Sequence, residues 1–212
     1  MLTGCDGFVF AGGVDERIEF PPPVYDYYYK YNIAPVAKLL KIAKSAGVKK
    51  AVILGSYFSY FAKLWPEKRL CDKHPYIRSR IDQENVALSF SDDKFEVMVL
   101  ELPYIFGAMK GRKPVWMFLI NMLLNMKNNV YYPKGGTTMV TVKQTGQCIA
   151  GALERGLGGT CYPVGMYNMK WKEMLKIMLK YIGAPDKKIV TIPTMIYKLS
   201  SYVTRKKYIK QG

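Results

Sequence analysis

Histidine and cysteine are scarce in this sequence. Among its 212 residues there is one histidine, His74, and there are four cysteines that lie far apart and form no C-x-x-C pair. Metal sites and disulfide frameworks need such residues at short spacing, and a histidine-based nucleophilic triad needs a histidine beside its nucleophile. The sequence therefore indicates neither a metal centre nor a disulfide scaffold, and we interpret the thiols as reduced structural groups.

Long uninterrupted hydrophobic runs are also missing. The strongly apolar segment Val115–Met126 is well short of the roughly 20 residues that a membrane-spanning helix requires. The N-terminal residues lack the basic-then-apolar order of a signal peptide. We therefore expect no transmembrane helix and a cytoplasmic location.

Acidic residues are few compared with basic ones, 16 against 32, which gives a formal net charge of +16. Such a charge can attract nucleic acid or an anionic membrane surface. The lysines, however, are spread along predicted helices at solvent-facing spacing, and the tight basic cluster is Arg205–Lys207. We therefore expect a small-molecule substrate rather than nucleic acid. A basic binding surface remains a third interpretation, and a homodimer remains open.

Half of the residues are hydrophobic, which suffices for one well-packed domain, or for a domain with a small additional lobe. In the first half, short apolar runs alternate with amphipathic segments. The runs predict strands at Gly7–Ala11, Lys50–Ser56 and Phe95–Leu102. The amphipathic segments predict helices at Tyr27–Ala46 and Pro75–Phe90, and a predicted loop that precedes the second helix ends near His74. This alternation implies parallel strands with helical crossovers, so the expected fold class is α/β.

The organisation changes after Pro103. A glycine-rich basic loop, Gly107–Lys113, leads into a mixed region with predicted helices at Val115–Met126 and Trp171–Ile182 and predicted strands at Val130–Tyr132 and Met139–Val142. The apolar stripe of the second helix is expected to be core.

The residues with the most chemical content are Tyr76 and Arg80, which lie four apart on a predicted helix and so share a face. A nearby cation favours phenolate and can lower the pKa of a tyrosine. The pair is therefore a candidate proton-transfer unit. The two preceding strands end in Ala11-Gly12-Gly13 and Gly55-Ser56-Tyr57, and ligands bind at such strand ends in open parallel sheets.

Several longer segments have a recognisable order. Gly4–Gly12 (GCDGFVFAG) is similar to a G-x-D-x-V-x-x-A-G pattern, Asn32 precedes the amphipathic stretch of the first helix, and Lys49–Ser56 is a second buried strand. Further along, Tyr76, Arg80 and Glu84 fall on a Y-x-x-x-K-x-x-x-E pattern, Leu102–Gly107 is similar to an R-P-x-x-x-G turn, and Cys161–Gly165 is similar to a Y-N-V-G strand. In this order the segments resemble the extended short-chain dehydrogenase/reductases, specifically the NAD-dependent epimerase/dehydratase family, over nearly the whole chain.

The resemblance implies a Rossmann-like parallel sheet that binds NAD or NADP. It implies a partial dinucleotide-binding domain at residues 1–106, and a small substrate-binding lobe at residues 107–212 that is interleaved with the end of the Rossmann sheet. The catalytic residues it implies are Tyr76, Arg80, Ser56 and Tyr57. The cofactor-binding residues it implies are Ala11, Gly12, Gly13, Asn32, Gly55, Tyr76, Arg80, Pro103, Tyr104 and Ile105.

The sequence departs from the family pattern in three ways. Arg80 replaces the catalytic lysine and, being always protonated, cannot relay a proton. Tyr57 stands where the family has serine or threonine, and its ring is expected to crowd a substrate carbonyl. The glycine-rich turn that holds the pyrophosphate does not occur. We therefore expect a fragment that enters the pattern at strand four, lacks about 60 to 80 residues of a complete fold and binds a dinucleotide poorly by itself.

Two functional interpretations follow. In the first, the protein is an NAD(P)-dependent epimerase, dehydratase or reductase that acts on a sugar nucleotide or a small carbonyl or alcohol. In the alternative, it is a non-catalytic relative that serves as a cofactor sensor or a partner-binding module, as the residues at positions 57 and 80 suggest.

Overall fold

The computed structural model describes residues 2–193, 195 and 196. The chain forms two compact units, and it passes between them three times. The first unit contains the residues up to Pro103 together with Lys143–Val164; the second contains Tyr104–Val142 and the described residues from Gly165 onward.

The first unit follows the predicted alternation of strands and helices. Its elements are β1 (Gly7–Phe10), α1 (Val24–Tyr28), a π-helical turn (Tyr29–Ile33), α2 (Ala34–Ser45), β2 (Lys50–Leu54), α3 (Tyr57–Leu64), a 3-10 turn (Pro66–Lys68), α4 (Leu70–Lys73), α5 (Pro75–Leu88), β3 (Glu96–Glu101), α7 (Val142–Arg155, whose first residue belongs to the second unit) and β7 (Thr160–Pro163).

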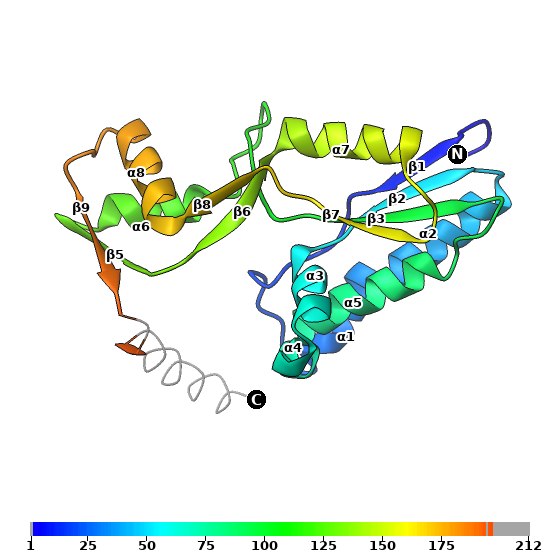
Figure 1. Cartoon of the computed structure of the whole chain (residues 1–212), viewed down its shortest axis with the longest axis horizontal. Coiled ribbons are helices and arrows are strands. Elements are labelled where there is room, and N and C mark those ends of the chain that lie inside the picture. Colours follow the sequence, from blue (N-terminus) through cyan, green and yellow to red (C-terminus); the bar gives the residue numbers. More distant parts are fainter. Residues whose placement is uncertain (1, 194, 197–212) are drawn as a thin grey trace. The chain divides into compact units, whose positions relative to one another are not determined.

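Four parallel strands form the sheet of this unit within the described residues, in the order β1-β2-β3-β7. Phe10 pairs with Ile53, Leu54 with Leu100, and Glu101 with Pro163. Helix α7 covers one face of the sheet, and α2 and α5 cover the other (Figure 1). The predicted α/β fold with a parallel sheet is confirmed. Its last strand, β7, is added after the chain has passed through the second unit.

The core of the first unit lies between the sheet and α2. Val36, Leu40 and Ala43 of this helix are fully buried and pack against strand residues that include Ile53 and Val99. Burial of one such aliphatic side chain contributes roughly 1.5 to 3 kcal/mol to stability. This packing holds the strand ends in a fixed position.

Two local expectations for this unit need correction. The first predicted helix is divided by a π-helical turn at Tyr29–Ile33, next to Pro35, which has no N–H for a regular helical bond. The loop predicted before His74 contains α3 and α4. Ser56 caps α3 by accepting a hydrogen bond of 3.3 Å from the Phe58 N–H, and this cap starts the helix.

The second unit holds two small sheets. Its elements are β4 (Tyr104–Phe106), α6 (Met117–Asn125), β5 (Asn129–Pro133), β6 (Gly136–Thr141), β8 (Tyr167–Lys170), α8 (Trp171–Tyr181) and β9 (Lys188–Ile192). Among the described residues, β6 pairs with β4 in parallel and with β8 antiparallel, and β5 pairs with β9 in parallel.

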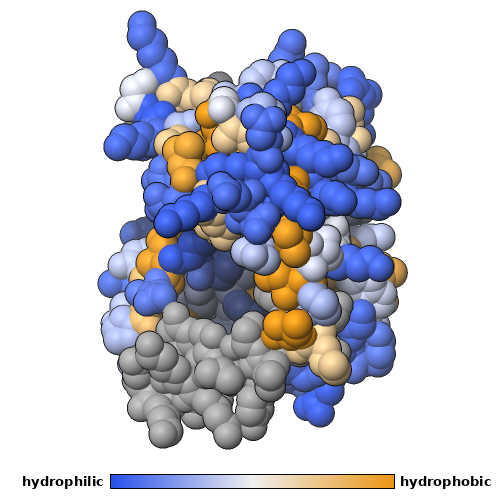
Figure 2. Space-filling view, turned by 90° about the vertical axis from the view of Figure 1, so that its left-hand side faces the viewer, coloured by the Kyte–Doolittle hydropathy of each residue, from blue (hydrophilic) through white to orange (hydrophobic). Residues whose placement is uncertain are grey.

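Helices α6 and α8 supply the core of the second unit through Leu119, Leu123, Leu175 and Leu179. The predicted burial of the stripe on α8 is confirmed at Met174 and at both of its leucines. Figure 2 shows one face of the molecule, where hydrophobic residues reach the surface among hydrophilic ones. Within the described residues, every helix is too short or too polar to cross a lipid bilayer.

Candidate functional site

The candidate site lies at the carboxyl edge of the parallel sheet in the first unit. Strand β1 ends at Phe10 and is followed by Ala11-Gly12-Gly13, and β2 ends at Leu54 and is followed by Gly55-Ser56. Because the two strands are parallel and paired, both segments leave the sheet at the same edge. Ligands bind at this edge in open α/β sheets.

The loop after β1 is fixed by Asn32, which is fully buried in the π-helical turn. The side-chain oxygen of Asn32 accepts a hydrogen bond of 2.8 Å from the Val14 N–H, and its amide nitrogen donates one of 3.0 Å to the Val14 carbonyl. The predicted cofactor residue Asn32 therefore lies beside the glycine loop, but both ends of its amide hold the loop backbone.

This arrangement requires a glycine at position 13, because there is no room for a side chain. Its φ of +130° lies in a region that L side chains rarely adopt, and a Cβ there would lie 2.7 Å from Oδ1 of Asn32. Ala11 and Gly12 are exposed at the same loop.

Gly55 has a packing role at the end of β2. Its N–H donates a hydrogen bond of 2.7 Å to the carbonyl of Leu100. A Cβ at Gly55 would lie 2.7 Å from Cγ1 of Val99, so the close approach of β2 to β3 requires glycine. The predicted cofactor role of Gly55 remains a proposal.

Tyr76 and Arg80 lie on α5, and both are buried, at 7% and 6% exposure. The guanidinium carbon of Arg80 is 5.9 Å from the centroid of the Tyr76 ring. Nη2 of Arg80 donates a hydrogen bond of 2.7 Å to the carbonyl of Leu54. The predicted pair is thus brought together at the end of β2.

The environment of Tyr76 differs from the sequence expectation. Burial raises the pKa of its phenol above the ordinary value, and the carboxylates of Glu16 and Asp15 raise it further, whereas Arg80 and a hydrogen bond with Ser56 lower it. The net direction is upward. Arg80 does lower the pKa, as the spacing predicts, but desolvation of the phenolate is the larger effect.

Ser56 and Tyr57 make different contacts in the site. Ser56 is buried and interacts through its hydroxyl with the phenol of Tyr76. The ring of Tyr57 packs on α3, with its centroid 4.7 Å from that of Phe58 and 5.1 Å from that of Phe61. Ser56 is thus joined to the proposed acid Tyr76.

The predicted turn at Pro103, Tyr104 and Ile105 is divided between the units. Pro103 ends the first unit, and the other two residues belong to β4 of the second. The Tyr104 ring packs against Trp116 with a centroid distance of 4.9 Å, and the Ile105 carbonyl accepts a hydrogen bond of 2.7 Å from Nε1 of Trp116.

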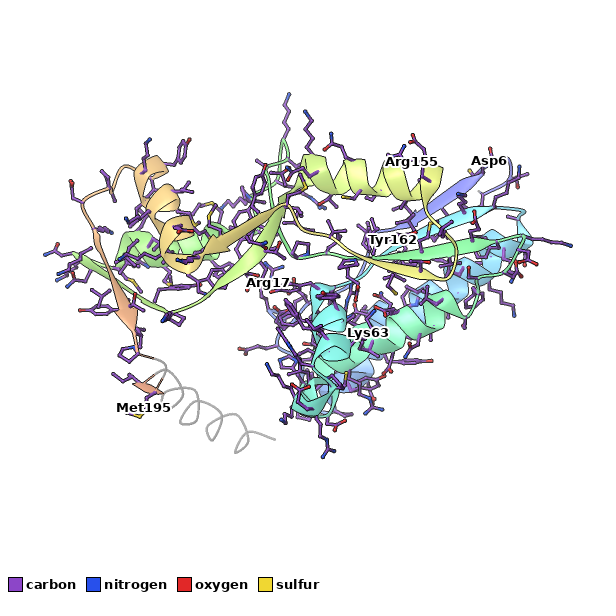
Figure 3. All side chains as sticks on the ribbon, viewed as in Figure 1. Asp6, Arg17, Lys63, Arg155, Tyr162 and Met195 are labelled. Carbon is purple, nitrogen blue, oxygen red and sulfur yellow. The ribbon has the colours of Figure 1, made fainter. Side chains whose placement is uncertain are left out.

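Sequence reasoning missed four charged residues that affect this site, namely Asp15, Glu16, Lys63 and Glu101. Asp15 and Glu16, in the loop after β1, act electrostatically on both Tyr76 and Arg80. Lys63 of α3, labelled in Figure 3, forms ion pairs with Glu84 and with Glu101. The charged Glu101, directly after the apolar run Val97–Leu100, was the available signal for a buried ion pair.

Metal-ligating side chains do not gather in the described part of the chain, where no group of three or more His, Cys, Asp or Glu residues could hold a metal ion. Donors for an organic ligand are present. Nε of Arg80 is buried without a hydrogen-bond partner among the described residues. Nη1 of the same side chain lies 3.6 Å from the Cβ position of Gly13.

Comparison with solved structures shows the fold. A double mutant of DesIV, dTDP-glucose 4,6-dehydratase from Streptomyces venezuelae with NAD bound, matches with a TM-score of 0.68 and 21% identity, over 90% of this chain and 62% of that one. The protein gox2253 matches with a TM-score of 0.74 and 19% identity, over 97% of this chain and 64% of that one.

A third similar structure is a mutant of UDP-glucuronic acid 4-epimerase from Bacillus cereus in complex with NAD. Its TM-score is 0.69 and its identity 14%, over 90% of this chain and 64% of that one. The chain thus spans less than two thirds of the length of these three proteins. No protein-family model and no curated protein sequence matches the chain. The predicted Rossmann-like fold is confirmed by these structures.

Proposed function

We propose that this chain is part of an NAD(P)-dependent protein of the epimerase/dehydratase kind, which acts on a sugar nucleotide or a small carbonyl or alcohol. The observation that carries the proposal is the convergence of Tyr76, Ser56 and Arg80 at the carboxyl edge of a parallel sheet. The same fold occurs in structures solved with NAD and in complex with UDP-4-deoxy-4-fluoro-glucuronic acid.

The residues present fit the nicotinamide end of such a cofactor. Arg80 keeps buried donors beside the loop that contains Gly13, where a ribose hydroxyl or a carboxamide oxygen could accept a hydrogen bond. When bound, a nicotinamide cofactor supplies hydride chemistry. The chain itself supplies the groups that handle the proton.

Tyr76 is the proposed acid and base. Because burial raises its pKa, the phenol is protonated at neutral pH and can donate its proton to a carbonyl oxygen. Ser56 would orient that oxygen, and Arg80 would stabilise the phenolate that remains. Arg80 holds charge in this scheme and does not transfer a proton.

The alternative is a relative that binds a dinucleotide without turnover. Two observations favour it: an arginine stands at the position of the family's lysine, and the ring of Tyr57 lies against Phe58 and Phe61 beside Ser56. The two functions share the cofactor-binding step and differ only in chemistry.

The first test is cofactor binding. The ¹⁵N-labelled chain is titrated with NAD⁺ and with NADP⁺ to millimolar concentration, and amide signals are followed. Binding at the proposed site moves the signals of Gly12, Gly13 and Ser56, and Arg80→Met weakens the effect. Absence of shifts at these residues with both cofactors contradicts the proposal.

The second test separates the two functions. Formation of NAD(P)H is measured with small alcohols, and conversion of sugar nucleotides, which leaves no net reduced cofactor in an epimerase or dehydratase, is measured by chromatography of the products. Turnover supports the enzyme, whereas saturable binding without turnover across the panel supports the non-catalytic relative. Lys41→Met, an exposed change on α2, is the matched control and should leave both measurements unchanged.

A further inference from the structure

Three functional groups lie in a row along one face of α5. Tyr76, Arg80 and Glu84 are spaced at four residues, and all are buried, with 7%, 6% and 4% exposure. Residues at this spacing are neighbours on a helix, and an arginine and a glutamate so placed are able to form an ion pair. No ion pair joins Arg80 to Glu84 in the described chain, where Arg80 donates to the Leu54 carbonyl instead.

Glu84 is paired with Lys63, a residue from another helix. Nζ of Lys63 lies 2.5 Å from Oε1 of Glu84 and 3.1 Å from Oε1 of Glu101. The carboxylate side chains are 5% and 1% exposed, whereas that of Lys63 is 43% exposed. Lys63, labelled in Figure 3, therefore reaches from the last turn of α3 to the two buried carboxylates.

The cluster contains one ammonium group and two carboxylates. Burial opposes the charged ammonium, but the bonds to Glu84 and Glu101 outweigh it and raise the pKa of Lys63 to about 12. Burial also raises the pKa of Glu101, and Lys63 only partly offsets this. One ammonium group is thus paired with two carboxylates. Its removal would leave Glu84 buried without a cation, and a nearby cation would then be attracted to it.

Arg80 is an alternative cation, because it lies one helical turn from Glu84 and the two groups interact electrostatically. At present its Nε is buried without a partner among the described residues, and its Nη1 faces the loop at Gly13. A turn toward Glu84 would take the guanidinium away from this loop and from the Leu54 carbonyl.

We propose that Lys63 is a positioning residue of the site. By holding Glu84, it keeps Arg80 out of an ion pair within α5 and leaves the guanidinium donors directed at the loop that contains Gly13. In this role Lys63 acts through Glu84. This inference rests on the proposed function for its ligand, but the competition between the two cations can be measured without any ligand.

The test follows the Nε–H signals of arginine in the ¹⁵N-labelled full chain, which has seven arginines. The signal of Arg80 is assigned by its loss in Arg80→Lys. Lys63→Met should shift this signal, because Arg80 turns to Glu84. The double variant Lys63→Met/Glu84→Gln should return it to the original position, because no carboxylate attracts Arg80. Lys63→Arg should leave it unchanged.

Cofactor titration gives a second measurement. Lys63→Met should weaken NAD⁺ binding about tenfold, as expected for the loss of one good hydrogen bond, and the double variant should recover most of it. Lys41→Met is the control for loss of a lysine charge elsewhere. If Lys63→Met does not fold, Lys63→Gln replaces it: its neutral amide no longer balances the charge of Glu84, so the Arg80 signal should still shift.

An unmoved Arg80 signal in the Lys63 variant overturns the inference, as does a shift that Glu84→Gln does not reverse. In the latter case Lys63 would serve only the packing of α3. If the unmodified chain binds neither cofactor, the proposed function fails while the arginine spectra still decide the role of Lys63.

Discussion

Arg80 donates a hydrogen bond of 2.7 Å to the main-chain oxygen of Leu54, the last residue of β2. A side chain of α5 is thereby tied to the edge of the sheet from which Gly55 and Ser56 follow. Because Tyr76 lies one turn before Arg80 on the same helix, this bond also fixes the phenol relative to Ser56. The geometry of the candidate site thus depends on a guanidinium group that can form several directed bonds at once.

Tyr76→Phe tests the proposed acid. The variant keeps the ring and its packing against Tyr28, whose centroid is 5.6 Å away, but it loses the transferable proton. Turnover should fall by about 10² to 10⁴, with cofactor binding little changed. Tyr28→Phe is the control and should retain turnover. Equal activity of Tyr76→Phe and the unmodified chain would remove Tyr76 from the mechanism.

The pH dependence of carbonyl reduction follows from the environment of Tyr76. Reduction needs the protonated phenol, and burial raises the pKa of this group above its ordinary value of 10.0. The rate should therefore persist to alkaline pH and fall only above about pH 10, where the phenol ionises. Alcohol oxidation, which needs the phenolate, should rise over the same range. A fall in the reduction rate near neutrality would point to another acid.

Asn32→Ala tests the clamp on the loop after β1. The change removes both hydrogen bonds to Val14, whose N–H and carbonyl lose their partner, and also a longer one of 3.5 Å to Oγ of Ser79. The free energy of unfolding should fall by about 2 to 4 kcal/mol, measured by urea denaturation. Asn121→Ala, at an exposed position of α6, should change it by less than about 0.5 kcal/mol. Comparable effects of both changes would show that the clamp adds little.

Two glycine substitutions should act in opposite directions. Gly55→Ala places a methyl group 2.7 Å from Cγ1 of Val99 and should destabilise by about 1 to 3 kcal/mol. Gly146→Ala, in α7 with no atom within 4 Å of the new group, should stabilise by about 0.5 to 1 kcal/mol. Thermal unfolding of the two variants gives the signs. A Gly55→Ala variant as stable as the original would mean that β2 and β3 can separate there at little cost.

The cysteines should differ in reactivity. Cys5 is exposed, whereas burial and the nearby Glu84 raise the pKa of Cys161 to about 12. Because the thiolate is the reactive form, iodoacetamide at pH 8 should label Cys5 quickly and Cys161 very slowly in the folded chain. Mass spectrometry of peptides gives the rates, and both residues should react equally in urea. Fast labelling of Cys161 in the folded chain would contradict the buried carboxylate cluster around it.

The sequence predicts the strands of the first sheet well, because Lys50–Leu54 and Glu96–Glu101 are short, apolar and nearly fully buried. It also predicts that Tyr76 and Arg80 share a helix face. It does not predict α3, whose aromatic segment Tyr57–Leu64 has no clear polar face and depends on the cap at Ser56.

The ion pairs of Lys63 also could not be predicted from local sequence patterns. Glu84, Glu101 and Lys63 come from three separate elements, so only the tertiary fold brings them together. The direction of the pKa shift at Tyr76 was missed for a related reason. Spacing places Arg80 near the phenol, but the burial that outweighs it comes from Tyr28 and Phe58 on other helices.

The pairing of β3 with β7 has a consequence for how the chain reaches its native state. Met98 pairs with Thr160, although all of Tyr104–Val142, a part of the second unit, lies between them in sequence. Contacts between such distant segments form slowly, because the entropy cost of closing a long loop comes before the contacts contribute any stabilisation. During synthesis, the first three strands therefore emerge well before β7, and the outer edge of β3 remains open until residue 163 has left the ribosome.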